Sequence, residues 1–154
     1  MKARDIMTPH PACVTPSDTA QRVAQLMEEH DCGCLPVVSP DDQSQLLGVV
    51  TDRDLALRGL AQGKGPDTPV RELMTPDVEA CPPEAKLDEV EKVMADRQVR
   101  RVPVVDGDQH VLGIIAQADL ARVAKRGRKP TPESLTAVIE KISQPGAQGS
   151  ATRE

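Results

Sequence analysis

The sequence of 154 residues contains no phenylalanine, tyrosine or tryptophan. A hydrophobic core in this chain must therefore be built from Val, Leu, Ile, Met and Ala side chains. The same absence removes the aromatic platforms on which proteins usually stack the bases of single-stranded nucleic acids. If a purine binds to this chain, aliphatic side chains and backbone groups must hold its ring.

The chain also lacks an excess of positive charge and long apolar runs. Its net charge is −5, with 19 Lys and Arg against 24 Asp and Glu, whereas nucleic-acid-binding domains are usually basic. No apolar run approaches the ~18 residues of a transmembrane helix, and Met1–Asp5 include no hydrophobic signal core. We therefore expect a cytoplasmic protein that binds neither membranes nor nucleic acids, with its four cysteines reduced.

What the sequence does contain is an internal duplication. The first block reads Arg-Asp-Ile-Met-Thr-Pro in one copy and Arg-Glu-Leu-Met-Thr-Pro in the other. Three blocks occur twice in the same order: residues 4–9 and 71–76, 35–38 and 102–105, and 47–50 and 112–115. Such a repeat limits the fold, because two similar units bury their apolar faces against each other. The seam between two such units is a natural ligand site.

Each copy predicts the order strand, helix, strand, strand, helix. The elements expected in the first copy are a strand at 12–15, a helix that begins near Ser17 or Asp18 and ends before Gly33, strands at 35–38 and 46–50, and a helix from Thr51 to about Leu60. Those expected in the second copy are a strand at 78–81, a helix from 83, strands at 102–105 and 111–115, and a helix at 117–124. A last helix is expected at 132–142, followed from Gln144 onward by a disordered tail rich in Pro, Gly, Ser and Ala.

The order of the elements and the repeated motifs resemble the CBS domain family, and the pair resembles a stand-alone tandem CBS module, also called a Bateman module. The resemblance covers roughly residues 4–125, and its most specific motifs are those at 5–8, 35–38 and 48–54. It implies an α+β fold of two β-α-β-β-α repeats packed with pseudo-twofold symmetry, followed by a short C-terminal helix and a flexible tail. The expected domains are repeat one at 1–62, a linker at 63–70, repeat two at 71–126, and the C-terminal helix and tail at 127–154.

One motif of the first copy, Gly48-x-x-Thr51-x-x-Asp54, lies where a strand is expected to end and a helix to begin. Gly48 has no Cβ, so a ligand or a neighbouring backbone can approach it closely. Thr51 and Asp54 have the spacing of a capping box, whose side chains bond the first free amides of a helix. Because a helix N-terminus also attracts phosphate, the same residues can form part of a nucleotide site, and the two interpretations are compatible.

In the CBS family, the residues that match Thr51 and Asp54 contact phosphate and ribose, so the resemblance implies these roles here. The implied ligand is AMP, ADP or ATP, or alternatively NAD or S-adenosylmethionine, and it is regulatory rather than an obligatory cofactor. A homodimer through the CBS helices and an unidentified effector protein are also implied. The base is expected to lie against backbone and aliphatic groups of Val14, Thr15, Pro36 and Val37.

The second copy departs from this motif. It keeps Gly113 and Asp119 but has Ala116 where the first copy has a threonine, which removes a hydroxyl. We therefore expect a second, degraded site near Asp119, Gly33 and Cys34.

Two arginines occur in the second copy and not at the equivalent positions of the first. Arg100 and Arg101 precede the second proline-containing strand, and in several CBS proteins a basic residue here grips the ligand phosphates, sometimes from the partner repeat. Arginine suits this role because its planar fork binds phosphate oxygens bidentately. The combination predicts one competent site per chain, with Thr51 and Asp54 from the first copy and Arg100 or Arg101 from the second. The alternative is that the arginines form a solvated edge.

Other functions stay open at this point. A structural or interaction module with a vestigial nucleotide site would carry the same motifs. His30, Cys32 and Cys34 could belong to a metal or redox sensor, although structural zinc sites need about four ligands. No arrangement of nucleophile and base is readable, so we do not predict an enzyme. The favoured hypothesis is a regulatory adenine-nucleotide-binding module that transmits ligand occupancy to a partner or to a dimer.

Overall fold

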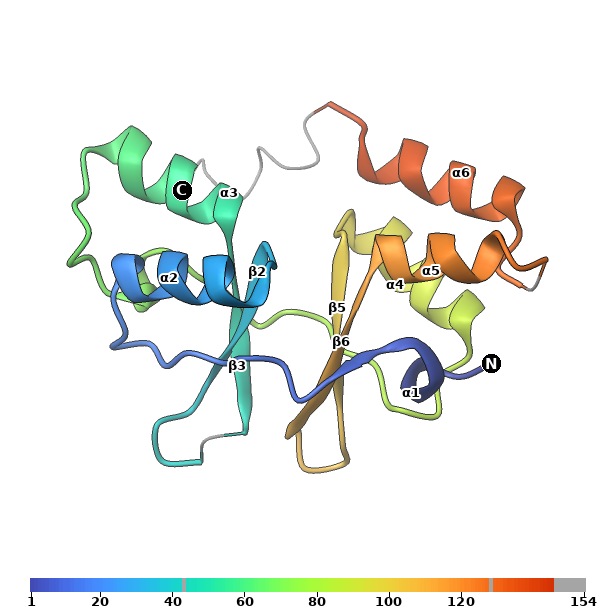
Figure 1. The fold of residues 1–154 in the computed structure, drawn as a ribbon, viewed down its shortest axis with the longest axis horizontal. Helices are drawn as coiled ribbons and strands as arrows, with labels where there is room; N and C mark the ends of the chain where they lie inside the picture. The colour runs from blue at the N-terminus through green and yellow to red at the C-terminus, as the bar shows by residue number, and fades with distance from the viewer. Residues whose placement is uncertain (43, 128, 146–154) are drawn as a thin grey trace. The chain divides into compact units, whose positions relative to one another are not determined.

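The computed structural model describes residues 1–42, 44–127 and 129–145, and the chain divides into two compact units (Figure 1). The central unit consists of His10–Val78 with Asp108–Val111. The terminal unit consists of Met1–Pro9, Glu79–Gly107 and the described residues from Leu112 onward. Each unit contains one three-stranded sheet and its own helices.

The central unit has the strand order β2-β3-β4. β2 (Cys34–Val38) pairs antiparallel with β3 (Leu46–Thr51), which pairs on its other side with the short strand β4 (Thr75–Pro76). Helix α2 (Ala20–His30) and the helical segment that starts with α3 (Asp52–Asp54) lie on the same side of the β2–β3 hairpin (Figure 1). The buried core of this unit is formed by Val14, Val23, Leu26, Met27, Leu35, Val37, Val50, Val70 and Leu73.

The helical segment after β3 is not a uniform α-helix. α3 continues as a π-helical turn at Leu55–Gly59 and a 3-10 turn at Leu60–Gln62. A separate 3-10 turn, Val70–Glu72, precedes β4. The predicted helix to about Leu60 is therefore confirmed in extent, and the structure adds that its geometry departs from a regular α-helix after Asp54.

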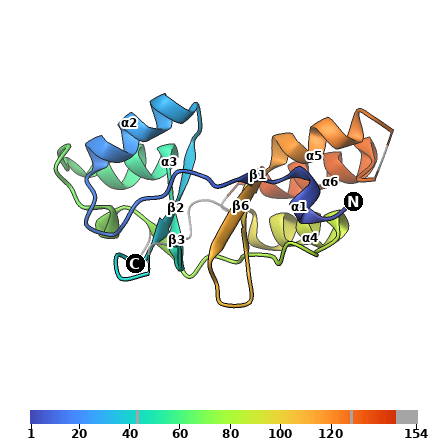
Figure 2. The same cartoon turned by 60° about the horizontal axis from the view of Figure 1, so that its bottom comes forward.

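The terminal unit has the strand order β1-β6-β5. After the short helix α1 (Ala3–Ile6), β1 (Thr8–Pro9) pairs antiparallel with β6 (Val111–Ala116), as Figure 2 shows. β6 also pairs with β5 (Arg101–Val105). The sheet of this unit therefore combines strands from both ends of the chain's duplicated region.

Three helices complete the terminal unit. α6 (Pro132–Ile142) packs against both α4 (Leu87–Arg97) and α5 (Gln117–Ala124). The predicted helices at 117–124 and 132–142 are confirmed. In the described part of the chain, no helix is long and apolar enough to cross a membrane. The disordered tail predicted from Gln144 lies mostly outside the described residues, which end at 145.

The compact units divide the chain differently from the sequence repeats. The first Met-Thr-Pro motif forms β1, which pairs with β6 of the second copy, and the second motif forms β4, which pairs with β3 of the first copy. Each copy therefore supplies one short strand to the sheet formed by the other copy's hairpin. The boundaries at 62, 70 and 126 describe the sequence repeats and stay predictions.

Gly48 and Gly113 lie where these short strands approach the hairpins. A Cβ on Gly48 would lie 2.2 Å from the carbonyl oxygen of Thr75, and a Cβ on Gly113 would lie 2.8 Å from that of Thr8. Each distance is shorter than real Cβ contacts. Of the two reasons for a glycine at 48, the structure supports the close approach of a neighbouring backbone.

The first strand expected in each copy is shorter than predicted. In the central unit Val14 alone forms a bridge, to Val37, because Pro11 and Pro16 on either side have no N–H to extend a ladder. In the terminal unit Cys81 alone forms the equivalent bridge. The β-α-β-β-α order therefore holds with a single bridge in place of each first strand.

Two helices begin later than the sequence predicts. α2 follows Thr19, whose Oγ1 accepts the Arg22 N–H at 3.2 Å. The Asp18 carboxylate is not the cap because it accepts the Thr15 N–H at 2.7 Å instead. α4 begins at Leu87 rather than at 83.

Candidate functional site

Thr51 and Asp54 lie together at the junction of β3 and α3. Thr51 Oγ1 accepts the Asp54 N–H at 3.1 Å, and Asp54 Oδ2 accepts the Thr51 N–H at 3.0 Å. The capping-box interpretation is therefore confirmed. The reciprocal bonds hold the hydroxyl and the carboxylate close together at a helix start.

The Asp54 carboxylate is partly removed from water, with 14% of its side chain exposed. This burial raises the pKa of Asp54, although the hydrogen bonds from Thr51 and the charge of Arg58 oppose the shift. Arg58 Nε lies 3.8 Å from Asp54 Oδ1. Partly buried ionisable groups of this kind are frequent at functional sites.

Arg58 was not singled out from the sequence. Its Nη1 donates to the carbonyl oxygen of Met74 at 2.7 Å and to that of Leu73 at 3.4 Å. Its side chain is 21% exposed. The signal that could have found it is the spacing of an acidic and a basic residue at i and i+4 on a helix.

The residues expected to contact a base are brought together in part. The Val14 N–H donates to the carbonyl oxygen of Pro36 at 3.0 Å, and Val14 forms its bridge with Val37. The side chains of Val14 and Val37 are fully buried. Thr15 is half-buried, and its N–H is bonded to the Asp18 carboxylate. Contact of these residues with a base stays a prediction.

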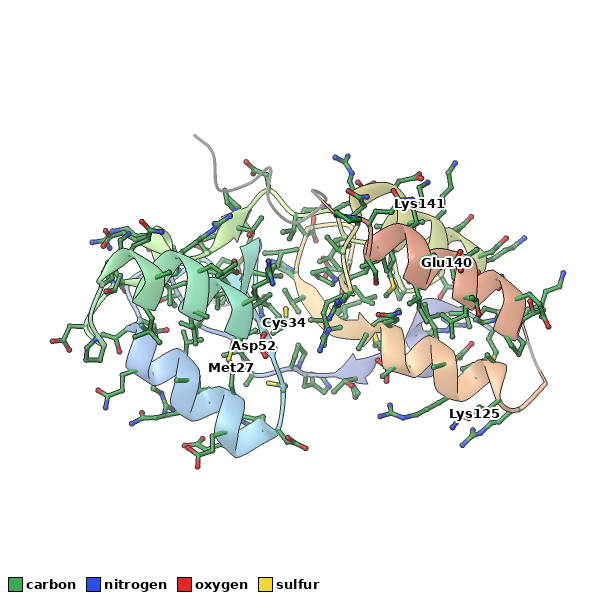
Figure 3. The ribbon with its side chains drawn as sticks, turned by 90° about the horizontal axis from the view of Figure 1, so that it is seen from above. Met27, Cys34, Asp52, Lys125, Glu140 and Lys141 are labelled. Carbon is green, nitrogen blue, oxygen red and sulfur yellow. The ribbon has the colours of Figure 1, made fainter. Side chains whose placement is uncertain are left out.

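Gly33 and Cys34 lie beside the same helix start. Cys34 is paired with Thr51 across the β2–β3 ladder, and the Asp52 N–H donates to the carbonyl oxygen of Gly33 at 3.0 Å. Figure 3 shows Cys34 and Asp52 next to each other at this end of the hairpin, with Met27 of α2 nearby. The predicted contribution of Gly33 and Cys34 to a degraded site near Asp119 stays a prediction, because Asp119 belongs to the terminal unit.

The terminal unit repeats this junction without the hydroxyl. The Ala116 N–H donates to Asp119 Oδ2 at 2.7 Å, but Ala116 has no side-chain oxygen to accept a bond from the helix. The other carboxylate oxygen of Asp119 accepts a hydrogen bond from Arg122 Nη1 at 2.7 Å. Both oxygens of this carboxylate therefore already have partners.

Arg100 and Arg101 lie beside the start of α5 in their own unit. The carbonyl oxygen of Arg100 accepts the Gln117 N–H at 3.0 Å, which matches the contact of Gly33 in the central unit. Arg100 is exposed and Arg101 is half-buried. Their predicted cooperation with Thr51 and Asp54 would join two units and stays a prediction.

An open pocket of about 170 Å³ lies next to Asp119 in the terminal unit. Asp119 was expected at a site from its place in the repeat, and Asp5 and Ile6 belong to the repeated motif at 5–8, although no ligand role was predicted for them. The pocket is lined by Met1, Asp5, Ile6, Asp119, Arg122, Val123 and Arg126.

The cysteines do not form a recognisable metal site in the described residues. None of them belongs to a group of three or more His, Cys, Asp and Glu side chains close enough to share an ion. Burial raises the pKa of Cys13, and it raises that of Cys81 to about 11.

A sequence model of the CBS domain matches residues 3–59 and again residues 70–126. The chain therefore belongs to the CBS domain family and contains two copies of the domain. The CBS domain-containing protein YhcV of Bacillus subtilis is 42% identical over 118 residues, which cover 77% of this chain and 81% of YhcV. Hypoxic response protein 1 of Mycobacterium tuberculosis is 41% identical over 121 residues, which cover 78% of this chain and 82% of that protein.

Solved structures of similar proteins contain different ligands. Hypoxic Response Protein I with two coordinated zinc ions is 41% identical, with a TM-score of 0.71 over 79% of this chain and 98% of that one. The CBS domain pair of protein MJ0100 with methylthioadenosine and S-adenosyl-L-methionine is 26% identical, with a TM-score of 0.75 over 83% and 98%. CBSX2 in complex with AMP is 28% identical, with a TM-score of 0.70 over 81% and 96%. The predicted family and fold class are confirmed.

Proposed function

We propose that this protein is a regulatory module that binds an adenosyl ligand at the β3–α3 junction and transmits its occupancy to a second copy or to a partner protein. Two of the similar CBS structures hold AMP, or S-adenosylmethionine with methylthioadenosine, which supports this ligand class. The observation that carries the proposal is the Asp54 carboxylate, which is 14% exposed and is held beside the Thr51 hydroxyl.

The chemistry of the junction suits a nucleotide. A carboxylate accepts hydrogen bonds from both hydroxyls of a ribose, and Asp54 is fixed in place for this role by the Thr51 N–H. The Thr51 hydroxyl can donate its own proton to a phosphate oxygen while its lone pairs serve the helix. In a chain without aromatic residues, and with the side chains of Val14 and Val37 fully buried, a purine would lie against the backbone around the Val14–Val37 bridge.

The two copies differ in the groups that this chemistry needs. The terminal unit has Ala116 in place of the hydroxyl, and its Asp119 carboxylate is already bonded to Arg122. We therefore propose one competent site per chain, at Thr51 and Asp54, and a weaker one at Asp119. Arg100 or Arg101 would supply the phosphate contacts.

Titration calorimetry with AMP, ATP and S-adenosylmethionine tests this proposal. We expect about one strong site per chain, and Asp54→Asn should weaken binding at least tenfold because the substitution removes the charge and keeps the shape. Asp52→Asn is the matched control, since Asp52 is exposed and lies two residues away. Asp119→Asn should leave the strong site unchanged. Two equal sites, or normal binding by the Asp54 variant, would contradict the proposal.

A zinc-dependent module is the second candidate, because Hypoxic Response Protein I holds two zinc ions. The sequence suggested His30, Cys32 and Cys34 for such a function, but the side chains of the described residues that lie close enough to share an ion are those of Asp106, Asp108 and His110. Thermal unfolding separates the candidates, since a ligand at 100 times its Kd stabilises the folded state by about 2.7 kcal/mol. A rise in Tm with AMP supports nucleotide binding, and a rise with zinc that a chelator reverses supports the second candidate. No change with either supports a structural module with a vestigial site.

A further inference from the structure

The two copies differ at the position four residues after the aspartate of the strand–helix junction. Asp54 is followed four residues later by Arg58, and Asp119 is followed four residues later by Val123. The Arg58 side chain is 21% exposed, so a charge lies largely buried in the central unit where the terminal unit buries a valine.

Arg58 connects the Asp54 carboxylate of the candidate ligand site to the backbone segment that precedes β4. Its guanidinium lies 3.8 Å from the Asp54 carboxylate on one side and donates to the carbonyl oxygen of Met74 at 2.7 Å on the other. Met74 and the preceding Leu73, whose carbonyl Arg58 also binds, lie between the 3-10 turn Val70–Glu72 and β4. Arginine is suited to such a bridge because its planar fork presents five donors in fixed directions.

The local backbone of the central unit also differs at this point. Arg58 lies in the π-helical turn Leu55–Gly59, whereas the equivalent helix of the terminal unit, α5, is a regular α-helix. π turns within helices are frequent at functional sites. In α5 the arginine bonded to Asp119 is Arg122, at i+3, and its side chain is 73% exposed. A buried bridge of the Arg58 kind is therefore specific to the central unit among the described residues.

The pocket of the terminal unit supports the same comparison. Its lining includes Asp119, Val123 and Ile6, and these match Asp54, Arg58 and Leu73 in the sequence repeat. In the central unit the guanidinium of Arg58 lies between the Asp54 carboxylate and the backbone carbonyls of Leu73 and Met74. In the terminal unit, where the shorter Val123 takes its place, a pocket is open.

We propose that Arg58 is a positioning residue that orients the Asp54 carboxylate for a ribose and couples ligand occupancy to the segment that enters β4. The inference rests on the proposed function. A ribose hydroxyl that donates to Asp54 holds the carboxylate in the position in which it also pairs with Arg58, so ligand binding and the contacts of Arg58 with the carbonyls of Leu73 and Met74 strengthen each other. Ligand binding then stabilises this segment, as coupling between two sites requires a difference between two states.

Binding of a ribose-deficient analogue tests the positioning role. We expect Arg58→Met to weaken AMP about tenfold and 2′,3′-dideoxy-AMP less than twofold, because the effect acts through the carboxylate that binds the ribose hydroxyls. Arg58→Lys should restore part of the affinity for AMP. Arg53→Met, at an exposed position of the same helical segment, is the matched control and should bind like the wild type. Equal losses for both nucleotides would show a merely structural role and overturn the inference.

Amide hydrogen exchange tests the coupling. The amides of Met74 and Asp77 donate to the carbonyls of Val70 and Leu47, so they report on this segment. Saturating AMP should slow their exchange in the wild type and not in Arg58→Met, with urea unfolding used to confirm that the variant is folded. The same response in both proteins would overturn the inference.

The free protein separates this inference from the proposed function. Without ligand, the amide hydrogens of Met74 and Asp77 should exchange at least fivefold faster in Arg58→Met than in Arg53→Met. The reason is that Arg58→Met loses the contacts of Arg58 with Asp54 and with the Met74 carbonyl. Equal rates would refute the bridge even if AMP binds. If the wild type binds no adenosyl ligand, the proposed function fails and the coupling fails with it, whatever the free-protein rates show.

Discussion

Gly48 lies where β4 approaches β3, and its replacement by alanine tests the packing of that crossing. An alanine Cβ would lie 2.2 Å from the carbonyl oxygen of Thr75, 2.7 Å from Met74 Cε and 3.0 Å from Pro76 Cα. The Met74 side chain is flexible and can move aside. The Thr75 carbonyl belongs to a paired strand, so β4 must shift or separate from β3.

The expected loss of stability follows from two opposing effects. Adding a methyl group to a well-packed region usually costs about 1–3 kcal/mol, and we expect the upper end because the clash is with backbone. Replacing a glycine also reduces the freedom of the unfolded chain, which stabilises the folded state by about 0.4–1 kcal/mol. The net destabilisation of Gly48→Ala should therefore be about 2 kcal/mol.

Urea unfolding followed by far-ultraviolet circular dichroism measures this loss, since the chain has no tryptophan or tyrosine for fluorescence. Gly65→Ala is the matched control, because a Cβ at this position would have no atom within 4 Å, and it should raise the free energy of unfolding by about 0.4–1 kcal/mol. In a thermal scan, Gly48→Ala should lower the Tm by about 4–8 °C. Equal urea midpoints for the two variants would refute the close approach of β4.

Three further predictions concern the terminal unit. Ile142→Ala should cost about 3 kcal/mol in urea unfolding because Ile142 is 1% exposed, whereas Ile139→Ala, at a position 40% exposed, should cost less than about 1 kcal/mol. Burial raises the pKa of Glu91 above its ordinary 4.5, so its destabilising effect is absent below pH 4.5, develops as the pH rises above the unfolded-state pKa, and is complete above the folded-state pKa. Glu91→Gln should accordingly raise the Tm at pH 7 and not at pH 4, and a constant difference would contradict this reasoning. Ala116→Thr should add about 1 kcal/mol in urea unfolding by supplying the missing cap oxygen, and an unchanged midpoint would count against it.

The longer elements of the fold could be predicted because their patterns extend over several residues. α6 has apolar side chains at helical spacing and a threonine cap, Thr131, immediately before Pro132. β1 and β4 could not be predicted in the same way, because two residues carry no periodicity and their partners lie far away in the sequence. The sequence therefore does not reveal the exchange of short strands between the copies, although Gly48 already indicated a close approach.

The candidate site was predictable only where it depends on local spacing. The bonds between Thr51 and Asp54 follow from a three-residue interval within one helix start. The contacts of Arg58 depend on a π turn and on carbonyls at Leu73 and Met74, 15 and 16 residues further along the chain. No short sequence pattern indicates either feature.

The comparison of the two copies shows which side chains the strand–helix junction needs in order to form and which it does not need. The terminal unit forms the same strand–helix junction with Ala116 and with a buried valine at 123, so neither a hydroxyl nor a buried arginine is required to build it. Replacing a buried ion pair by apolar side chains is often neutral or stabilising. Burial of Arg58 in the central unit is therefore not explained by the needs of this junction, whereas a buried carboxylate is common to both units, since the Asp119 side chain is 12% exposed. The proposed role of Arg58 beside a ligand-binding carboxylate gives the arrangement a reason.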